Sequence, residues 1–158
     1  IKQELDGLYA RYLHEALAQA LLGVAAVVAL LWWQLRSWRQ LWAACVPLAL
    51  AVLITLGGFA ALGVPLGILH LVGLLLVVAV GSNYGLFFVQ WPMAQDDAPA
   101  DARQADTLAS LLLANVTAVC GFGLIALSQI PALSAIGRVV APGVLLALLL
   151  CAAFAPRR

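Results

Sequence analysis

Residues 66–91 read LGILHLVGLLLVVAVGSNYGLFFVQW, a run without aspartate, glutamate, lysine or arginine. A helix needs ~20 apolar residues to cross a hydrocarbon core of ~30 Å, and this run is longer than that. Because unpaired backbone groups cannot be left in lipid, the run must form a helix if it enters a membrane. The sequence therefore predicts a transmembrane span at this position.

Four further apolar stretches accompany this run, at about residues 16–33, 41–62, 108–127 and 131–155. The chain of 158 residues is 65% hydrophobic and 9% charged, with a mean hydropathy of +1.07. Soluble domains are about one quarter charged, and a soluble fold of this size cannot bury so much apolar surface. The sequence predicts an all-α, polytopic transmembrane bundle of five spans over residues 16–158, with the lipid bilayer around it.

Residues 1–15 differ from the rest because charged residues alternate with apolar residues at helical spacing. This pattern predicts an amphipathic lead-in at the membrane surface, entering from an extracytoplasmic domain. The chain begins with Ile1, and no basic stretch with a cleavage site opens it. We therefore expect the sequence to be a fragment of a longer protein.

Arginine in the connections predicts how the spans are oriented. Five spans place three connecting segments on the same side of the membrane: residues 34–40, the loop 92–106 and the tail 156–158. These segments contain Arg36, Arg39, Arg103, Arg157 and Arg158. The tight turns 63–65 and 128–131 contain none. The positive-inside rule places the arginine side, including the C-terminus, in the cytoplasm. The tryptophans lie near the same interface, as an aromatic belt does, at Trp32, Trp33, Trp38, Trp42 and Trp91.

Several classes of function find no support in the residues. The net charge is +1 and the basic residues are scattered, which argues against a nucleic-acid partner and against a patch for anionic lipids. Cys45, Cys120 and Cys151 are interpreted as small buried packing residues, and His14 and His70 as hydrogen-bonding residues. The sequence contains no metal-binding, phosphate-binding or nucleophile motif, so it predicts neither an enzyme nor a cofactor.

The polar group within residues 66–91 is the first candidate site. Ser82, Asn83 and Tyr84 lie between Gly81 and Gly85 in an otherwise apolar span. Polar residues inside a membrane are costly and often functional, whereas small residues allow close contact between helices. Two interpretations stay open: hydrogen bonds that join packed helices, which are common, or a functional site.

The stretch 108–127 adds a second polar group. Asn115 and Thr117 are candidates to face Asn83 across the bundle, and the alternative is again hydrogen bonding between helices. Gly121 and Gly123 are candidate packing glycines. Arg138 lies some turns into the last span, where we expect its long side chain to extend to the interface in preference to pairing inside the bundle.

The order of short motifs resembles that of a known family. The motifs are Leu35–Ser37, Val46–Pro47, Gly63–Leu66, His70–Leu71, Gly81–Phe88, Ser110, Asn115–Thr117, Gly121–Leu124, Ser128–Leu133, Ile136–Gly137 and Gly143. Over nearly the whole chain they look like the C-terminal membrane half of the resistance-nodulation-division (RND) superfamily. More narrowly, they resemble the MMPL-type predicted exporters of bacteria.

This resemblance implies a fold of twelve spans in two halves, of which the five spans here would be the last five. It implies a part of a proton-coupled exporter of lipid-like or hydrophobic small molecules in the bacterial cytoplasmic (inner) membrane. The implied partners are the hydrophobic substrate and the missing N-terminal half of the same protein, and assembly into homo-oligomers stays open.

The family relay often uses Asp-Tyr pairs, and Asn83-Tyr84 stands at the matching position. Asparagine cannot titrate, so this half departs from the pattern. We expect Ser82, Asn83 and Tyr84 to orient a carboxylate from the missing half, with Asn115 and Thr117 as supporting candidates. A non-transporting membrane scaffold or sterol-sensing-like module, which shares this membrane fold, is the alternative.

Overall fold

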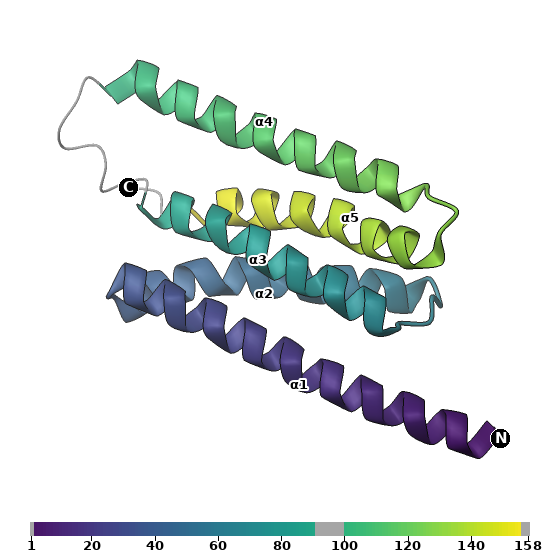
Figure 1. Cartoon of the computed structure of the whole chain (residues 1–158). Helices are drawn as coiled ribbons and strands as arrows, with labels where there is room; N and C mark the ends of the chain where they lie inside the picture. The colour runs from purple at the N-terminus through teal and green to yellow at the C-terminus, as the bar shows by residue number, and fades with distance from the viewer. Residues whose placement is uncertain (1, 91–99, 156–158) are drawn as a thin grey trace.

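The computed structural model describes the backbone of residues 2–90 and 100–155 and the side chains of residues 6–90 and 105–155. Its helices are α1 (Lys2–Leu35), α2 (Trp38–Ala61), α3 (Ile68–Gln90), α4 (Ala100–Ala126) and α5 (Pro131–Ala153). All five are long and apolar enough to cross a membrane. Figure 1 shows them running back and forth along one direction. The prediction of an all-helical bundle with five apolar helices is confirmed.

Two helices begin earlier than the predicted spans. Residues 2–15 of the lead-in are continuous with the first span, because α1 runs without a break from Lys2 to Leu35. The predicted loop 92–106 is helical from Ala100 onward. Alanine is the strongest helix former, and the alanines in residues 100–105 favour this early start. Trp91 and residues 156–158 lie outside the described residues.

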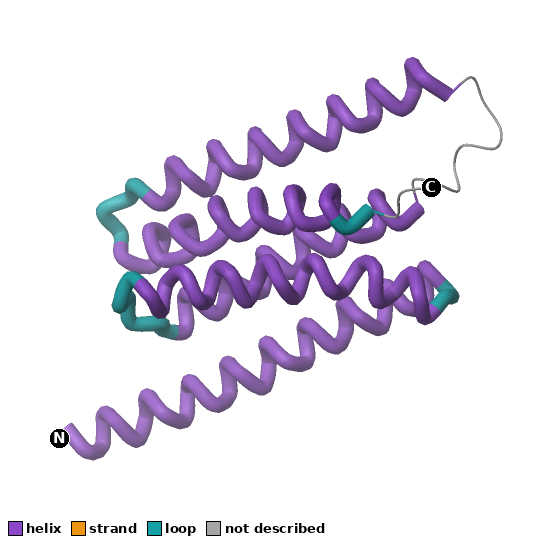
Figure 2. The backbone as a smooth tube through the Cα atoms, turned by 180° about the vertical axis from the view of Figure 1, so that it is seen from behind, coloured by secondary structure: helices purple, strands orange, loops and turns teal. Residues whose placement is uncertain are grey.

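Successive helices alternate in direction, so the bundle has two distinct ends (Figures 1 and 2). The turn end contains the start of α1 and the connections 62–67 and 127–130. The tryptophan end contains the connection 36–37, the ends of α3 and α5, and the start of α4. Arg36, Arg39 and the backbone of Arg103 therefore share one end of the bundle, as the alternation of five spans predicts.

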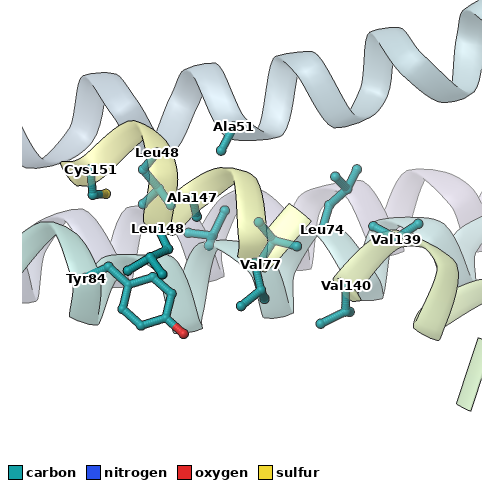
Figure 3. Packing of buried hydrophobic residues seen from close by; sticks show 12 residues of the cluster. Leu48, Ala51, Leu74, Val77, Tyr84, Val139, Val140, Ala147, Leu148 and Cys151 are labelled. Atoms are coloured by element: carbon teal, nitrogen blue, oxygen red, sulfur yellow. The ribbon is translucent and has the colours of Figure 1, made fainter. Parts of the chain in front are cut away.

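The centre of the bundle is formed by α2, α3 and α5. In the most apolar stretch of each helix, 50% of the residues of α5 and 44% of those of α3 are buried inside the bundle. In α1 and α4 the buried share is 6%. The main core consists of aliphatic side chains from α2, α3 and α5, with Tyr84 toward one end (Figure 3). The outer helix α1 packs on α2 and α3, whereas α4 packs along α5.

Glycines bring the central helices into close contact. A Cβ atom at Gly143 of α5 would collide with Val77 of α3, and one at Gly73 of α3 would lie 2.9 Å from the Cβ of Val139. Gly137 faces the backbone of α4 directly, so α4 approaches α5 where no side chain separates them. Small residues allow this approach, and dispersion contacts between closely packed helices then stabilise the bundle.

Candidate functional site

The buried polar group of the bundle is a hydrogen bond between α3 and α4. Asn115 Nδ2 donates to Tyr84 Oη at 3.0 Å and lies 3.4 Å from the carbonyl oxygen of Val144 in α5. Asn115 is 1% exposed and Tyr84 5% exposed. One carboxamide thus links three helices in a part of the core that is otherwise aliphatic. Such a bond between helices is worth about 1 kcal/mol in a membrane.

Local structure brings these two side chains together. Tyr84 lies between the buried Gly81 and Gly85 on the same side of α3, where it can approach α4 and α5. Asn115 is the buried position of α4 that faces them. Among the described residues, no buried side-chain nitrogen or oxygen lacks a partner. This group is therefore satisfied, and its evident role is to fix how α3, α4 and α5 pack.

Asn83 and Ser82 occupy a different side of α3. Together with Gln34 of α1 they are the polar residues of a shallow groove of about 250 Å³ between α1 and α3. The other lining residues are Val27, Leu30, Leu31 and Leu86. Ser82 donates to the carbonyl oxygen of Ala79 in its own helix at 2.7 Å. Asn83 is exposed, and no hydrogen bond joins its side chain to another described residue.

The expectation that Asn115 and Thr117 face Asn83 is therefore wrong. Asn115 faces Tyr84, the neighbour of Asn83, and adjacent helical residues point about 100° apart. Thr117 is exposed on the outer side of α4 and donates to the carbonyl oxygen of Leu113 at 2.8 Å. The five polar candidates thus divide into a buried pair, two groove residues and one outward-facing threonine.

The candidate packing glycines divide as well. A Cβ atom at Gly81 would collide with Leu48, and one at Gly85 would lie 3.2 Å from the carbonyl oxygen of Ala44. Both therefore serve close contact between α3 and its neighbours. A Cβ atom at Gly121 or Gly123 would meet no atom within 4 Å, so these two do not lie at a helix contact in this bundle.

Sequence reasoning missed the tightest contact, at Gly137. In the sequence, Ile136–Gly137 is one of the motifs that resemble the RND superfamily. It was not predicted as a packing contact, because a lone glycine gives no sign of which helix it faces. Gly137 lies six residues after Pro131 and next to Arg138, the charged residue of this span. Gly137 and Gly143 are both buried on α5, but they point about 120° apart and face α4 and α3 respectively, so their spacing does not mark this contact.

The remaining candidates have ordinary surroundings. Cys151 is buried and Cys45 half-buried, but Cys120 is exposed on α4, which corrects its interpretation as a buried residue. His70 Nδ1 accepts a hydrogen bond from the backbone N–H of Gly67 at 3.2 Å at the start of α3. Arg138 is exposed on the outer side of α5. Within the described residues, no three His, Cys, Asp or Glu side chains gather into a possible metal site.

Comparison of the chain with protein-family models, with curated proteins and with solved structures finds no match. The bundle and its polar groups are therefore the basis for any statement about function. A buried tyrosine–asparagine pair can fix helix packing, and an open groove with amide and hydroxyl groups can accept or donate hydrogen bonds to a partner.

Proposed function

We propose that this chain is part of a proton-coupled membrane exporter of lipid-like or hydrophobic small molecules. The protein would lie in a bacterial cytoplasmic membrane, with the tryptophan end and the C-terminus in the cytoplasm. The order of the motifs, which resembles that of the RND superfamily and its MMPL-type members, supports this proposal. The arginine count at the tryptophan end supports the orientation.

The observation that carries the proposal is the exposed Asn83 in the groove between α1 and α3. Asn83 lies seven residues before the end of α3, which places it about 10 Å inside the helix. A carboxamide facing lipid at that depth would lose its hydrogen bonds to water, at a cost of about 1–3 kcal/mol. A polar partner from another part of the protein would remove this cost, and Gln34 and Ser82 would extend the same contact.

The relay that we propose has separate parts. A carboxylate supplied by the missing half would carry the proton, because an asparagine side chain does not titrate near neutral pH. Asn83 would hydrogen-bond that carboxylate from the groove, with Ser82 beside it. Tyr84, on the neighbouring side of α3, is held by Asn115. A change at the carboxylate could thus be transmitted through α3 to the contacts with α4 and α5.

A second groove offers a route for an apolar substrate. It encloses about 170 Å³ between α1, α2 and α3 and is lined entirely by Ala, Val and Leu side chains. Its lining residues are Leu17, Ala20, Leu21, Val24, Val52, Leu56, Leu71, Leu74, Leu75 and Val78. Such a lining would accept an acyl chain or another apolar group without desolvating any polar group.

A scaffold or sterol-sensing-like module is the second candidate function. One specific observation favours it: among the described residues, α2, α3 and α5 contain no aspartate or glutamate. Proton relays in transporters usually include such a residue within the membrane. A scaffold would use the same grooves to bind a lipid without coupling its movement to protons.

Transport in reconstituted vesicles tests these alternatives. The protein that contains this chain is reconstituted with a fluorescent lipid, and export is measured with and without a pH gradient. The exporter proposal predicts gradient-dependent export that falls at least tenfold in Asn83→Leu with unchanged thermal stability. Thr117→Val is the matched control, because Thr117 is exposed and bonds only within α4. Equal export with and without the pH gradient would favour the scaffold. An Asn83→Leu variant that exports as fast as the wild type would refute the role of the groove.

A further inference from the structure

The end of α1 and the start of α2 present an unusual concentration of indole rings. Trp32, Trp33, Trp38 and Trp42 are between 55% and 79% exposed. Trp32 and Trp38 pack edge to face with ring centroids 5.7 Å apart, and Trp38 and Trp42 with centroids 6.4 Å apart. Tryptophan prefers the headgroup region of a bilayer, so these rings place the connection 36–37 at the membrane–water interface.

The backbone conformation of Arg36 is the second observation. Arg36 has φ 49°, and it is the only described residue other than glycine with a positive φ. Its N–H donates to the carbonyl oxygen of Trp32 at 3.0 Å and closes the end of α1. Glycine adopts this left-handed conformation without strain, whereas a residue with a Cβ atom does not. The strained position holds a guanidinium where a neutral, smaller residue would suit the backbone better, and such strain points to function.

The surface around Arg36 has the form of an amphiphile site. Arg36 borders a hollow of about 460 Å³ whose other lining residues are Ala29, Trp32 and Trp33. Arg39 lies three residues further along and is exposed. Neither guanidinium forms an ion pair with a carboxylate of the described residues. The fold sets Arg36 beside a hollow with aromatic and apolar walls, and Arg39 follows in the first turn of α2.

We propose that the hollow lined by Ala29, Trp32, Trp33 and Arg36 binds the headgroup of an anionic glycerophospholipid, and that Arg39 attracts the same lipid from the start of α2. Arginine pairs with phosphate through two parallel N–H···O bonds, so the Arg36 guanidinium would hold the phosphate, and the charge of Arg39 would add to the attraction. The indole rings would lie against the glycerol and ester groups, and the acyl chains would follow α1 past Ala29 into the bilayer. This proposal does not depend on the exporter function, since a scaffold would bind the same lipid.

The position and chemistry of the surface favour a lipid over a soluble anion or an acidic protein segment. A soluble anion needs no apolar wall, and an acidic segment of a protein would not require four indole rings at bilayer depth. A basic residue near an anionic membrane surface contributes about 1 kcal/mol, which corresponds to about fivefold in binding for each arginine. The surface should therefore distinguish phosphatidylglycerol from phosphatidylcholine.

Quenching of tryptophan fluorescence by brominated lipids tests the proposal. The chain is reconstituted in phosphatidylcholine vesicles that contain brominated phosphatidylglycerol or, in a parallel series, brominated phosphatidylcholine. We expect the wild type to prefer phosphatidylglycerol. Arg36→Gln and Arg39→Gln should each lower this preference about fivefold, and the double variant should abolish it. Arg11→Gln, which removes an exposed arginine from the turn end, is the matched control and should leave the preference unchanged.

Two further measurements distinguish loss of the lipid site from misfolding of the variant and from binding of a soluble anion. Arg36→Gly removes the charge and also the strain, so it should fold at least as well as the wild type while losing the preference. Equal preference in the wild type and the double variant would overturn the proposal, as would an equal loss in Arg11→Gln. Inorganic phosphate added at the concentration of phosphatidylglycerol should not displace the lipid. If it does, the surface is a site for soluble anions and the lipid assignment is wrong.

Discussion

Gly137 is the position at which one added methyl group should disturb the bundle most. A Cβ atom at Gly137 would lie against the backbone N of Ala126 and the carbonyl oxygen of Phe122, and 2.8 Å from the Cα of Ala126. All three atoms belong to the backbone of α4, so no side chain can rotate away. In Gly137→Ala the two helices must therefore separate.

The size of the effect follows from that distance. Carbon atoms pack at about 3.5–4.0 Å, so α4 would have to move by about 1 Å, and a gap of that size forfeits up to half of the dispersion energy of each contact. Overpacking of a rigid site costs about 1–3 kcal/mol, whereas replacing glycine by alanine in a helix gains about 0.5–1 kcal/mol. Because only backbone atoms oppose the methyl group, the cost should be near the top of its range, about 3 kcal/mol, and the gain of about 1 kcal/mol leaves a net loss of about 2 kcal/mol in the free energy of unfolding of Gly137→Ala.

Gly121→Ala provides the matched control on the facing helix. A Cβ atom there meets nothing within 4 Å, so only the gain in helix propensity remains. The free energy of unfolding can be measured for both variants by titration with sodium dodecyl sulfate in mixed micelles. Spin labels on the outer sides of α4 and α5 would report their separation. Equal stabilities for the two variants, or an unchanged distance between helices in Gly137→Ala, would refute the close contact between α4 and α5.

Three further predictions follow from other contacts. Tyr84→Phe should lower the free energy of unfolding by about 1 kcal/mol, and a double-mutant cycle with Asn115→Leu should give a coupling energy of similar size. If the effects of the two substitutions on stability are additive, the hydrogen bond between Tyr84 and Asn115 is contradicted. Arg138→Leu should improve membrane insertion of α5 by up to about 3 kcal/mol, measured by glycosylation mapping, because the exposed charge is costly within a span; no change would mean that a partner neutralises Arg138. Gly23→Ala should alter stability by less than about 1 kcal/mol in the same detergent titration, because its Cβ atom meets only the movable end of Leu75 at 3.1 Å. A loss as large as that of Gly137→Ala would show that α1 is held more rigidly than this contact implies.

The architecture was predictable because it depends on length and hydropathy. A run such as residues 66–91 has to cross the membrane as a helix, and short connections force neighbouring helices to run in opposite directions. Arg36 and Arg39 were therefore assigned to the correct end of the bundle relative to the turns. The start of α4 was less predictable, because the alanines and aspartates of residues 100–106 satisfy the composition of a loop and of a helix equally well.

The pairing of polar residues was not predictable, because it depends on the rotation of each helix about its own axis. The sequence singled out Asn83, Tyr84 and Asn115 as polar residues in apolar spans. Away from its ends, α3 is apolar on every side apart from Ser82, Asn83 and Tyr84, so its hydropathy gives no sign of which side faces α4. Adjacent residues therefore separated, with Tyr84 in the core and Asn83 in a groove. The same ambiguity hid which glycines lie at helix contacts.

The strain at Arg36 could not be read from composition either. A two-residue connection between helices commonly contains a residue in the left-handed conformation, and glycine or asparagine would have marked it. Arginine at this place gives no such signal. Only the fold brings the φ angle of Arg36, the exposed tryptophans and the hollow together at one place.

The dependence of α4 on α5 has a consequence for biosynthesis. Helices α1, α2 and α3 pack on one another and are made first, so they can associate while the rest of the chain is still being translated. The next helix, α4, has its extensive contacts with α5, which is made last. Until α5 has been synthesised, α4 therefore stays in the bilayer or beside the insertion machinery without the contacts that it makes with α5 in the finished bundle. Assembly of this protein would then finish in one late step, when α5 docks between α3 and α4 and closes the Tyr84–Asn115 contact.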